Sequence, residues 1–375
     1  GMSTTTQPSR TALLTMPAPS SAFAGTGALL RLALRRDRVR IPVWAVFAAL
    51  LTMSVATSWD RLYPTAEDRL GLAASLGADP TLSAILGPLF DPLTTGGLTA
   101  WRSSAGMLLT LGLVAAFLVV RHSRADEAEG RGDLILGGPV GHAAPLAAAL
   151  LAASVLLGSF AVLAALLLTA VGTGLVGSVA FAFTQSLAAL VFASVAGLTA
   201  QIARTSRGAN GLAGLVVGAA FLITAAGNGR EGGSPLQWLT PFGWAQQTRS
   251  YADERWWLLG LSFLAAVGIA LVALHIAARR DLGDGLVAQR AGRRTAASWI
   301  TGPRSLAWRL GRTSLVVWAI AFAVLGAVEG SMLNTSVDLV AKNPGMADIL
   351  LKLAGGTTDL KDAFLVTMTG LFGLV

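Results

Sequence analysis

The feature that most constrains this chain is a long segment without any formally charged side chain. From Leu134 to Ala203 there are 70 residues and no Asp, Glu, Lys or Arg. A helix needs only about 20 residues to cross the hydrocarbon core of a bilayer, so the segment is too long for a single crossing. A cluster of small residues between Gly172 and Ser178 predicts a turn. We therefore expect two spans, at roughly residues 144–171 and 179–201.

The composition of the whole chain excludes the soluble classes of protein. Only 13% of the 375 residues are charged and 54% are hydrophobic, whereas a soluble domain carries about 25% charged residues. So few charges cannot cover the surface of a globular protein of this size. The sequence also contains no cysteine, which excludes thiolate metal sites, thiol nucleophiles and disulfides.

Other charge-free runs complete an all-α, polytopic membrane architecture with six spans before residue 280. These four runs cover residues 41–59, 103–120, 208–229 and 256–278. Each is about as long as one helical crossing. A seventh apolar run, at 313–328, is followed by an eighth, at 363–375, that is too short to cross. We therefore expect the chain to be truncated inside a span.

The basic residues predict which side of the membrane faces the cytoplasm. With the N-terminus inside, the inner segments hold 19 of the 28 Lys and Arg residues, as the positive-inside rule requires. We therefore expect a multi-pass protein of the plasma membrane with a cytoplasmic N-terminus. Contact with anionic lipid accounts for the net charge of +8, so no nucleic-acid partner is expected.

The N-terminal part divides into three segments outside the spans. Residues 1–26 are rich in Ser, Thr, Pro and Ala and are expected to form a disordered cytoplasmic tail. Residues 27–40 combine four leucines with five arginines, which predicts an amphipathic helix on the membrane surface. The outer loop, residues 60–102, is more polar and contains four prolines. It is expected to form short interfacial or re-entrant helices.

An internal repeat relates two parts of the chain at an offset of 274 residues. Residues 32–45 match residues 306–319 at seven of fourteen positions. The matched residues in the first copy are Leu32, Ala33, Arg35, Arg38, Val43, Trp44 and Ala45. Parallel repeats build the two halves of many transporters. Residues 27–300 are therefore interpreted as a first six-span half and residues 301–375 as the start of a second.

The spans offer little chemistry of their own. Among the six predicted spans only His275 is ionisable, and it lies one turn from Arg279, where an interfacial histidine is expected. None of the three lysines follows a glycine, so the chain has no Gly-Lys-Ser or Gly-Lys-Thr phosphate-binding loop. The acidic residues at 126–133 alternate with arginines, which favours a self-paired helix over a metal site. No catalytic, cofactor-binding or metal-binding residues are expected.

Three segments resemble those of a known transporter family. Residues 121–134, RHSRADEAEGRGDL, followed by Gly-Pro-Val-Gly at 138–141, resemble a cytoplasmic loop of actinobacterial ABC transporter permeases. These permeases are of the polyketide-antibiotic exporter, or tetronasin-resistance, type. Residues 234–247, SPLQWLTPFGWAQQ, are similar to the outer loop before the sixth span of the same family. Residues 279–285, RRDLGDG, are similar to the segment immediately after that span.

The resemblance implies a permease of two six-span halves that depends on a separate cytoplasmic ABC ATPase subunit. ATP and magnesium would bind to that partner, which is expected in two copies. By the resemblance, residues 121–142 form a coupling loop that docks on the ATPase. The positions expected to contact it are Arg124, Asp126, Glu127, Glu129, Gly130, Arg131 and Asp133.

The sequence thus predicts the membrane-spanning permease subunit of an ATP-driven ABC exporter. Its cargo would be apolar or amphipathic small molecules such as antibiotics, moved outward by alternating access. Two alternatives remain: an ion-coupled secondary transporter and a lipid-modifying integral membrane enzyme. An ATPase subunit that co-purifies with the chain would favour the ABC exporter over both.

Overall fold

A computed structural model provides the structure of this chain. The residues that it describes are 21–77, 80–128, 138, 140–229, 234–279, 302–312, 315–316 and 319. The chain divides into two units, Gly1–Gln289 and Arg290–Val375. The boundary predicted from the repeat lies close by, between residues 300 and 301. In the second unit, residues 303–312 are helical.

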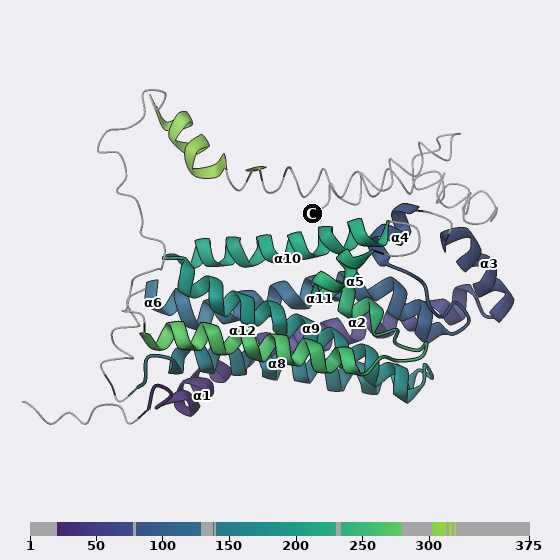
Figure 1. Ribbon diagram of the computed structural model, residues 1–375, viewed down its shortest axis with the longest axis horizontal. Coiled ribbons are helices and arrows are strands. Elements are labelled where there is room, and N and C mark those ends of the chain that lie inside the picture. The colour runs from purple at the N-terminus through teal and green to yellow at the C-terminus, as the bar shows by residue number, and fades with distance from the viewer. Residues whose placement is uncertain are drawn as a thin grey trace, which may run out of the picture. The chain divides into compact units, whose positions relative to one another are not determined.

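The first unit is a bundle of long helices with shorter helices at both ends (Figure 1). The described residues contain helices and no strand, which confirms the all-α prediction. The elements in chain order are α1 (Thr26–Arg36), α2 (Arg40–Leu62), α3 (Ala66–Gly77), α4 (Pro80–Leu86), α5 (Thr95–Val120), the π-helical turn η2 (Arg121–Ala125), α6 (Asp126–Ala128), α8 (Ala144–Ala170), α9 (Leu175–Ile202), α10 (Ser206–Asn228), the 3₁₀ turn η3 (Pro235–Leu239), α11 (Pro241–Gln247) and α12 (Trp257–Arg279).

Six of the described helices are long and apolar enough to cross a membrane, which confirms a multi-pass membrane protein. They are α2, α5 with its extension η2, α8, α9, α10 and α12. The turn expected inside the charge-free segment joins α8 to α9. Gly172 and Gly174 there have φ angles of 88° and 91°, a left-handed conformation that glycine adopts without steric cost.

The second span starts earlier than the sequence predicts. Helix α5 begins at Thr95, whereas the charge-free run begins at residue 103. Arg102 therefore lies within the helix, and the outer loop ends before residue 95 rather than at residue 102. The start is determined by Thr94, whose hydroxyl accepts a hydrogen bond of 3.0 Å from the amide of Gly97. Such a side-chain cap satisfies a helix amide that has no partner within the helix.

Helix α9 is the centre of the bundle and contacts α5, α8, α10 and α12. In its most apolar stretch 72% of residues are buried, compared with 33% in α2, 28% in α10 and 22% in α12. Many of its buried residues are alanine or glycine, and small residues allow membrane helices to approach closely. The rings of Phe192 in α9 and Phe221 in α10 both pack on the ring of Phe242 in α11.

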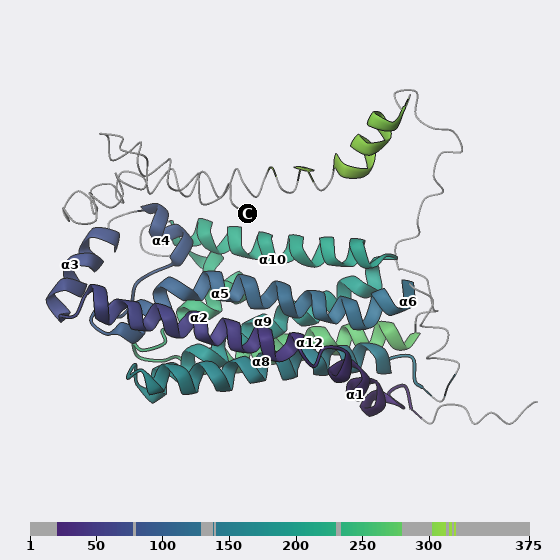
Figure 2. The same ribbon diagram turned by 180° about the vertical axis from the view of Figure 1, so that it is seen from behind.

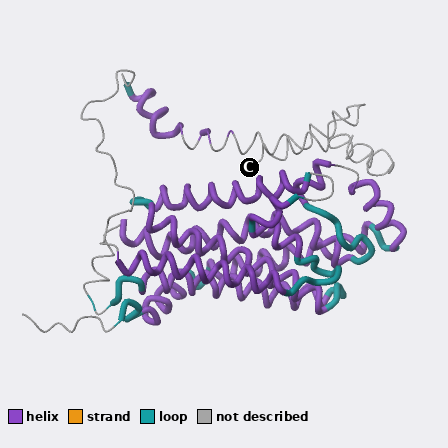
Figure 3. Tube along the Cα trace, in the orientation of Figure 1, coloured by secondary structure: helices purple, strands orange, loops and turns teal. Residues whose placement is uncertain are grey.

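Most of the short elements lie at the two ends of the bundle. One end, called the α1 end, carries α1 and α6 with the turn η2; the other, called the α3 end, carries α3 and α4 (Figure 2). Helix α11 lies among the long helices and contacts α5, α9, α10 and α12 (Figure 1). Loops of the bundle likewise lie at these ends (Figure 3). Short helices thus occur within residues 60–102 and one helix lies close to the expected residues 27–40. Their location at a membrane surface stays a prediction.

The N-terminal segment before α1 is held against the loop that precedes α8. The amides of Gly141 and Ala143 donate hydrogen bonds of 2.9 and 3.1 Å to the carbonyls of Ala24 and Ala22. Residues 21–26, which the sequence assigned to the tail, therefore lie in or next to this contact with the bundle. Residues 1–20 lie outside the described residues.

Candidate coupling site at the α1 end

The predicted coupling loop starts as a direct extension of α5. After Val120 the helix widens into the π-helical turn η2 and then continues as the short helix α6. The hydroxyl of Ser123 donates a hydrogen bond of 2.6 Å to the carbonyl of Val119. A π-helical turn inserts an extra residue into the helical repeat, so it redirects the side chains after it, and such turns are frequent at functional sites.

A buried carboxylate lies at the junction between α1 and α2. Asp37 is fully buried and its carboxylate is hydrogen-bonded to His122 Nε2 in η2. Two arginines face the same carboxylate: Arg121 at 3.5 Å and Arg40 at 3.7 Å, both measured from a guanidinium nitrogen to Oδ1. A carboxylate removed from water is stable only when it is paired and hydrogen-bonded. The pairing therefore ties the start of α2 to the end of α5.

A second ion pair joins α1 to α6. Arg36 Nη1 and Asp126 Oδ2 lie 2.9 Å apart, and Asp126 is buried. Helix α1 also packs on α8. Ala33, one turn before Arg36, is the buried residue of α1. The amphipathic helix is thus held in place by contacts on two sides.

Arg124 connects the same turn to the junction between α9 and α10. It is one of the largest fully buried side chains, with 1% of its surface exposed. Its Nε donates a hydrogen bond of 3.1 Å to the carbonyl of Arg204, and its Nη1 forms an ion pair with Glu127. Arginine supports such multiple contacts because its five N–H donors have a fixed planar geometry.

Together these contacts form a charged cluster, called the α1-end clamp. It consists of Arg36, Asp37, Arg40, Arg121, His122, Arg124, Asp126 and Glu127. The clamp joins α1, α2 and α5 through ion pairs, and the hydrogen bond from Arg124 extends it to the junction between α9 and α10. Its acidic residues Asp37 and Asp126 are buried, whereas Arg40 and Arg121 are exposed. The clamp therefore connects α6 to several spans.

The structure places three of the seven predicted contact positions. Arg124 and Asp126 are buried in the clamp, and Glu127 is half-buried beside Arg124. Their observed partners belong to this chain, so contact with an ATPase stays a prediction for all three. The other four positions, Glu129, Gly130, Arg131 and Asp133, lie outside the described residues.

Two buried members of the clamp, Asp37 and His122, are not predicted as site residues by the sequence. Asp37 is the single acidic residue in the segment 27–40, which contains five arginines. This lone acid is the sequence signal that could have indicated an ion pair here. His122 directly follows the apolar run of α5, where the sequence predicts a loop. His275, the ionisable residue within the predicted spans, is exposed one turn before the end of α12, as an interfacial histidine would be.

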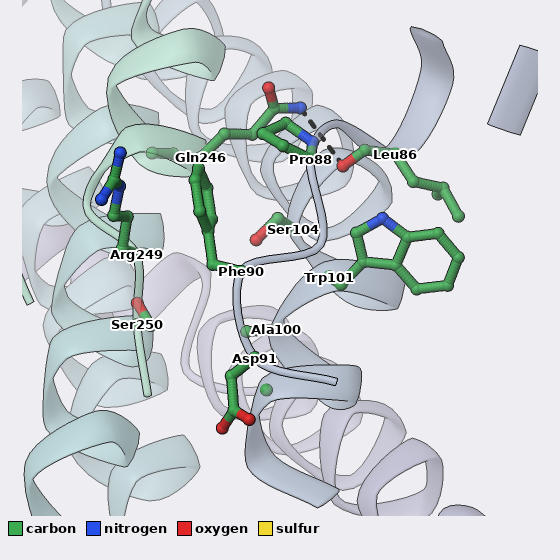
Figure 4. Close-up of a pocket in the computed structure, with 12 residues that line it drawn as sticks. Leu86, Pro88, Phe90, Asp91, Ala100, Trp101, Ser104, Gln246, Arg249 and Ser250 are labelled. Atoms are coloured by element: carbon green, nitrogen blue, oxygen red, sulfur yellow. Dashed lines mark hydrogen bonds between the residues drawn. The ribbon is translucent and has the colours of Figure 1, made fainter. Parts of the chain in front are cut away.

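The α3 end is closed by a network of amide side chains. Gln246 donates to the carbonyl of Leu86 at 3.4 Å (Figure 4). Its own side-chain carbonyl accepts a hydrogen bond of 3.0 Å from Asn228. The indole N–H of Trp101 donates to Gly87 at 2.8 Å. The cavity between these groups has a volume of about 30 Å³, which is room for a water molecule and not for a transported compound.

Tyr251 locks the turn between α11 and α12 against the bundle. Its ring packs on Gly177, and its hydroxyl is 3.1 Å from Ser178 Oγ and 3.3 Å from Thr173 Oγ1. Burial raises the pKa of the Tyr251 phenol, and the two hydrogen bonds oppose this rise. Its φ angle is 72°, a strained conformation that the surrounding contacts maintain.

Within the described part of the chain, no three His, Cys, Asp or Glu side chains come together as they would around a metal ion. The candidate site is therefore ionic and structural in character. Its chemistry is the pairing of carboxylates with guanidinium groups and imidazole.

Comparison with known proteins shows to which family this chain belongs. The family described as "Multidrug efflux system permease Rv1217c, C-terminal domain" matches residues 300–375. Multidrug efflux system permease protein Rv1217c of Mycobacterium tuberculosis is 39% identical over 367 residues, which cover 96% of this chain. The chain is a homologue of an efflux permease. The resemblance to exporter permeases seen in its loops is thereby confirmed.

The efflux-permease homologue is the longer of the two proteins, since the chain covers 65% of its length. The family match begins at residue 300, next to residue 301, where the internal repeat places the start of the second copy. The repeat itself stays a prediction.

Proposed function

We propose that the chain is the membrane-spanning part of an ATP-driven exporter of apolar or amphipathic small molecules. The observation that carries the proposal is the 39% identity to a multidrug efflux permease over nearly the whole chain. Six described helices that can cross a membrane support it. The absence of a phosphate-binding loop from the sequence means that ATP hydrolysis would occur on a partner subunit.

In this proposal the ATPase subunit, with its ATP and magnesium, docks at the α1 end on the loop after α6. Two copies would serve two halves of the transporter. The α1 end and the N-terminus would then face the cytoplasm, in accord with the concentration of arginine there. The α1-end clamp would transmit the movement of the ATPase to α1, α2 and α5 through its ion pairs, and to the junction between α9 and α10 through the hydrogen bond of Arg124 with the carbonyl of Arg204.

The test uses charge reversal outside the clamp, so that folding is preserved. We expect the double variant Glu129→Arg, Arg131→Glu to lose co-purification of the ATPase and drug export. The control is Glu67→Arg, on the exposed surface of α3, which should retain both. If the double variant keeps its ATPase and its export, docking on this loop is wrong. Loss of both functions in the control would instead place the partner at the α3 end.

One observation favours the ion-coupled alternative enough to test it. The buried pair of Asp37 and His122 is an ionisable site next to a span, and such sites serve as proton relays in secondary transporters. Drug transport by the purified chain in vesicles, driven by a pH gradient without any ATPase, would support that alternative. Transport that requires both the ATPase and ATP contradicts it.

A further inference from the structure

A groove between α2 and α5 is large enough to hold a small molecule. Its volume is about 540 Å³, within the range of roughly 300–1,000 Å³ that is typical of small-molecule sites. The wall formed by α2 includes Phe47, Leu51 and Val55, which are spaced one turn apart. Gly106 and Thr110 of α5 line it with the same spacing.

The groove has a polar end and an apolar end. The two helices run in opposite directions, so the start of α5 lies beside the end of α2. This arrangement brings Arg102 and Ser103 to the same end as Trp59, whereas Phe47 and Met107 line the part nearer the middle of the bundle. The positions from Phe47 to Trp59 span about 18 Å at 1.5 Å per residue.

The polar end presents hydrogen-bond donors that have no partner. Trp59 Nε1 and Ser103 Oγ are buried without a hydrogen bond. Arg102 is exposed, and among the described residues it has no ion-pair or hydrogen-bond partner. The nearby carboxylate of Asp60 is engaged with Arg69 at 3.2 Å. A guanidinium and an indole N–H can only donate, so the group that satisfies them must be an acceptor, and preferably an anion.

We propose that this α2–α5 groove binds an amphipathic carboxylate as export cargo. The apolar body of the compound lies along the apolar wall, and its carboxylate accepts hydrogen bonds from Arg102, with Trp59 and Ser103 as further donors. The planar guanidinium matches a carboxylate by two parallel hydrogen bonds. A cationic cargo would be repelled at this end, and an unsubstituted hydrocarbon would leave the donors unpaired. The inference rests on the proposed export function and specifies its substrate class.

The test compares an acid with its neutral analogue. The chain is placed in phosphatidylcholine nanodiscs and titrated with dansyl-labelled undecanoate or with the corresponding amide, and dansyl fluorescence reports binding. We expect the acid to bind at least about tenfold more tightly than the amide, as a charge-assisted hydrogen bond predicts. Arg102→Gln should abolish this preference and Arg102→Lys should keep most of it. Arg61→Gln, an exposed arginine that does not line the groove, is the matched control.

Three outcomes would overturn the proposal. They are equal binding of acid and amide to the unaltered chain, an unchanged preference in Arg102→Gln, and displacement of the probe by phosphatidylglycerol added to the nanodiscs. The last result would make the groove a lipid site. The first comparison needs no variant, so a folding defect in one cannot obscure it. No ATPase is present, so a negative result leaves the proposed export function standing, and loss of ATPase docking leaves the groove unaffected.

Discussion

Asp37 is buried at the junction of α1 and α2, where its carboxylate meets His122 and two arginines. Asp60, in the last turn of α2, is 55% exposed and has one ion-pair partner, Arg69. The two carboxylates belong to the same residue type and lie near opposite ends of α2. Their difference in burial should decide how much each contributes to stability.

We expect Asp37→Ala to lower the free energy of unfolding by about 3–5 kcal/mol, because it removes the buried carboxylate that pairs with His122 and with two arginines. Asp60→Ala should cost less than about 1 kcal/mol, because its exposed ion pair is screened by water. Thermal unfolding in detergent, followed by tryptophan fluorescence, measures both. Similar shifts in the two variants would show that the clamp does not stabilise this end of the bundle.

We expect the stability of the folded protein to decrease at alkaline pH, where the buried phenol of Tyr251 loses its proton. Burial raises its pKa above the ordinary value of about 10, so the folded protein keeps a proton that the unfolded chain has already released. This contribution is fully present below about pH 10 and is lost as the pH rises through the folded-state pKa. Tyr63→Phe leaves Tyr251 as the one remaining tyrosine, and its phenolate absorbance should then appear above pH 10. A midpoint at or below 10 would contradict the buried position.

At the scale of the elements, the packing of α9 depends on residues without a side chain. A β-carbon added to Gly177 would lie 2.1 Å from the ring of Tyr251, whereas one added to Gly158 in α8 would meet nothing within 4 Å. The two glycines lie in neighbouring helices of the bundle, so Gly158 can serve as the control for a substitution at Gly177.

We expect Gly177→Ala to destabilise the chain by about 1–3 kcal/mol, as overpacking generally does. Gly158→Ala should be neutral or slightly stabilising, because alanine favours a helix more than glycine does. In a Tyr251→Gly background the same Gly177→Ala change should cost less, because the ring that the added β-carbon would meet is absent. Thermal unfolding of the single variants and the double variant measures these differences. An equal cost of Gly177→Ala in both backgrounds would mean that the ring is not the obstacle.

The elements also show where prediction from the sequence succeeds and where it fails. Helices α8, α9, α10 and α12 are predicted within a few residues, because their apolar runs end at charges or at glycine turns. Helix α5 is predicted too short, because the charge-free run stops at Arg102 although the helix continues past it. The cap at Thr94 is the better signal, since a capping side chain marks a helix start more directly than a lone charge does.

At the scale of the whole molecule, the orientation in the membrane is open to direct measurement. The sequence contains no cysteine, so a single introduced thiol reports its own location. Gly71→Cys, on the exposed surface of α3, should react with an impermeant thiol reagent added to intact cells. Glu129→Cys should react only after the cells are opened. The reverse pattern would place the α1 end outside and rule out docking of a cytoplasmic ATPase there.

The six spans before residue 280 and the approximate ends of most of them follow from the sequence alone. The apolar runs at 313–328 and 363–375 lie almost entirely outside the described residues. The physical reason is that the cost of burying charge in hydrocarbon is local to each residue, so the pattern of charges is sufficient to locate the spans. The lack of an ATP-binding loop is visible in the same way. The clamp around Asp37 and the groove beside Arg102 are visible only in the tertiary structure. Each depends on side chains from helices far apart in the chain, and only their packing determines which charges are paired and which remain available.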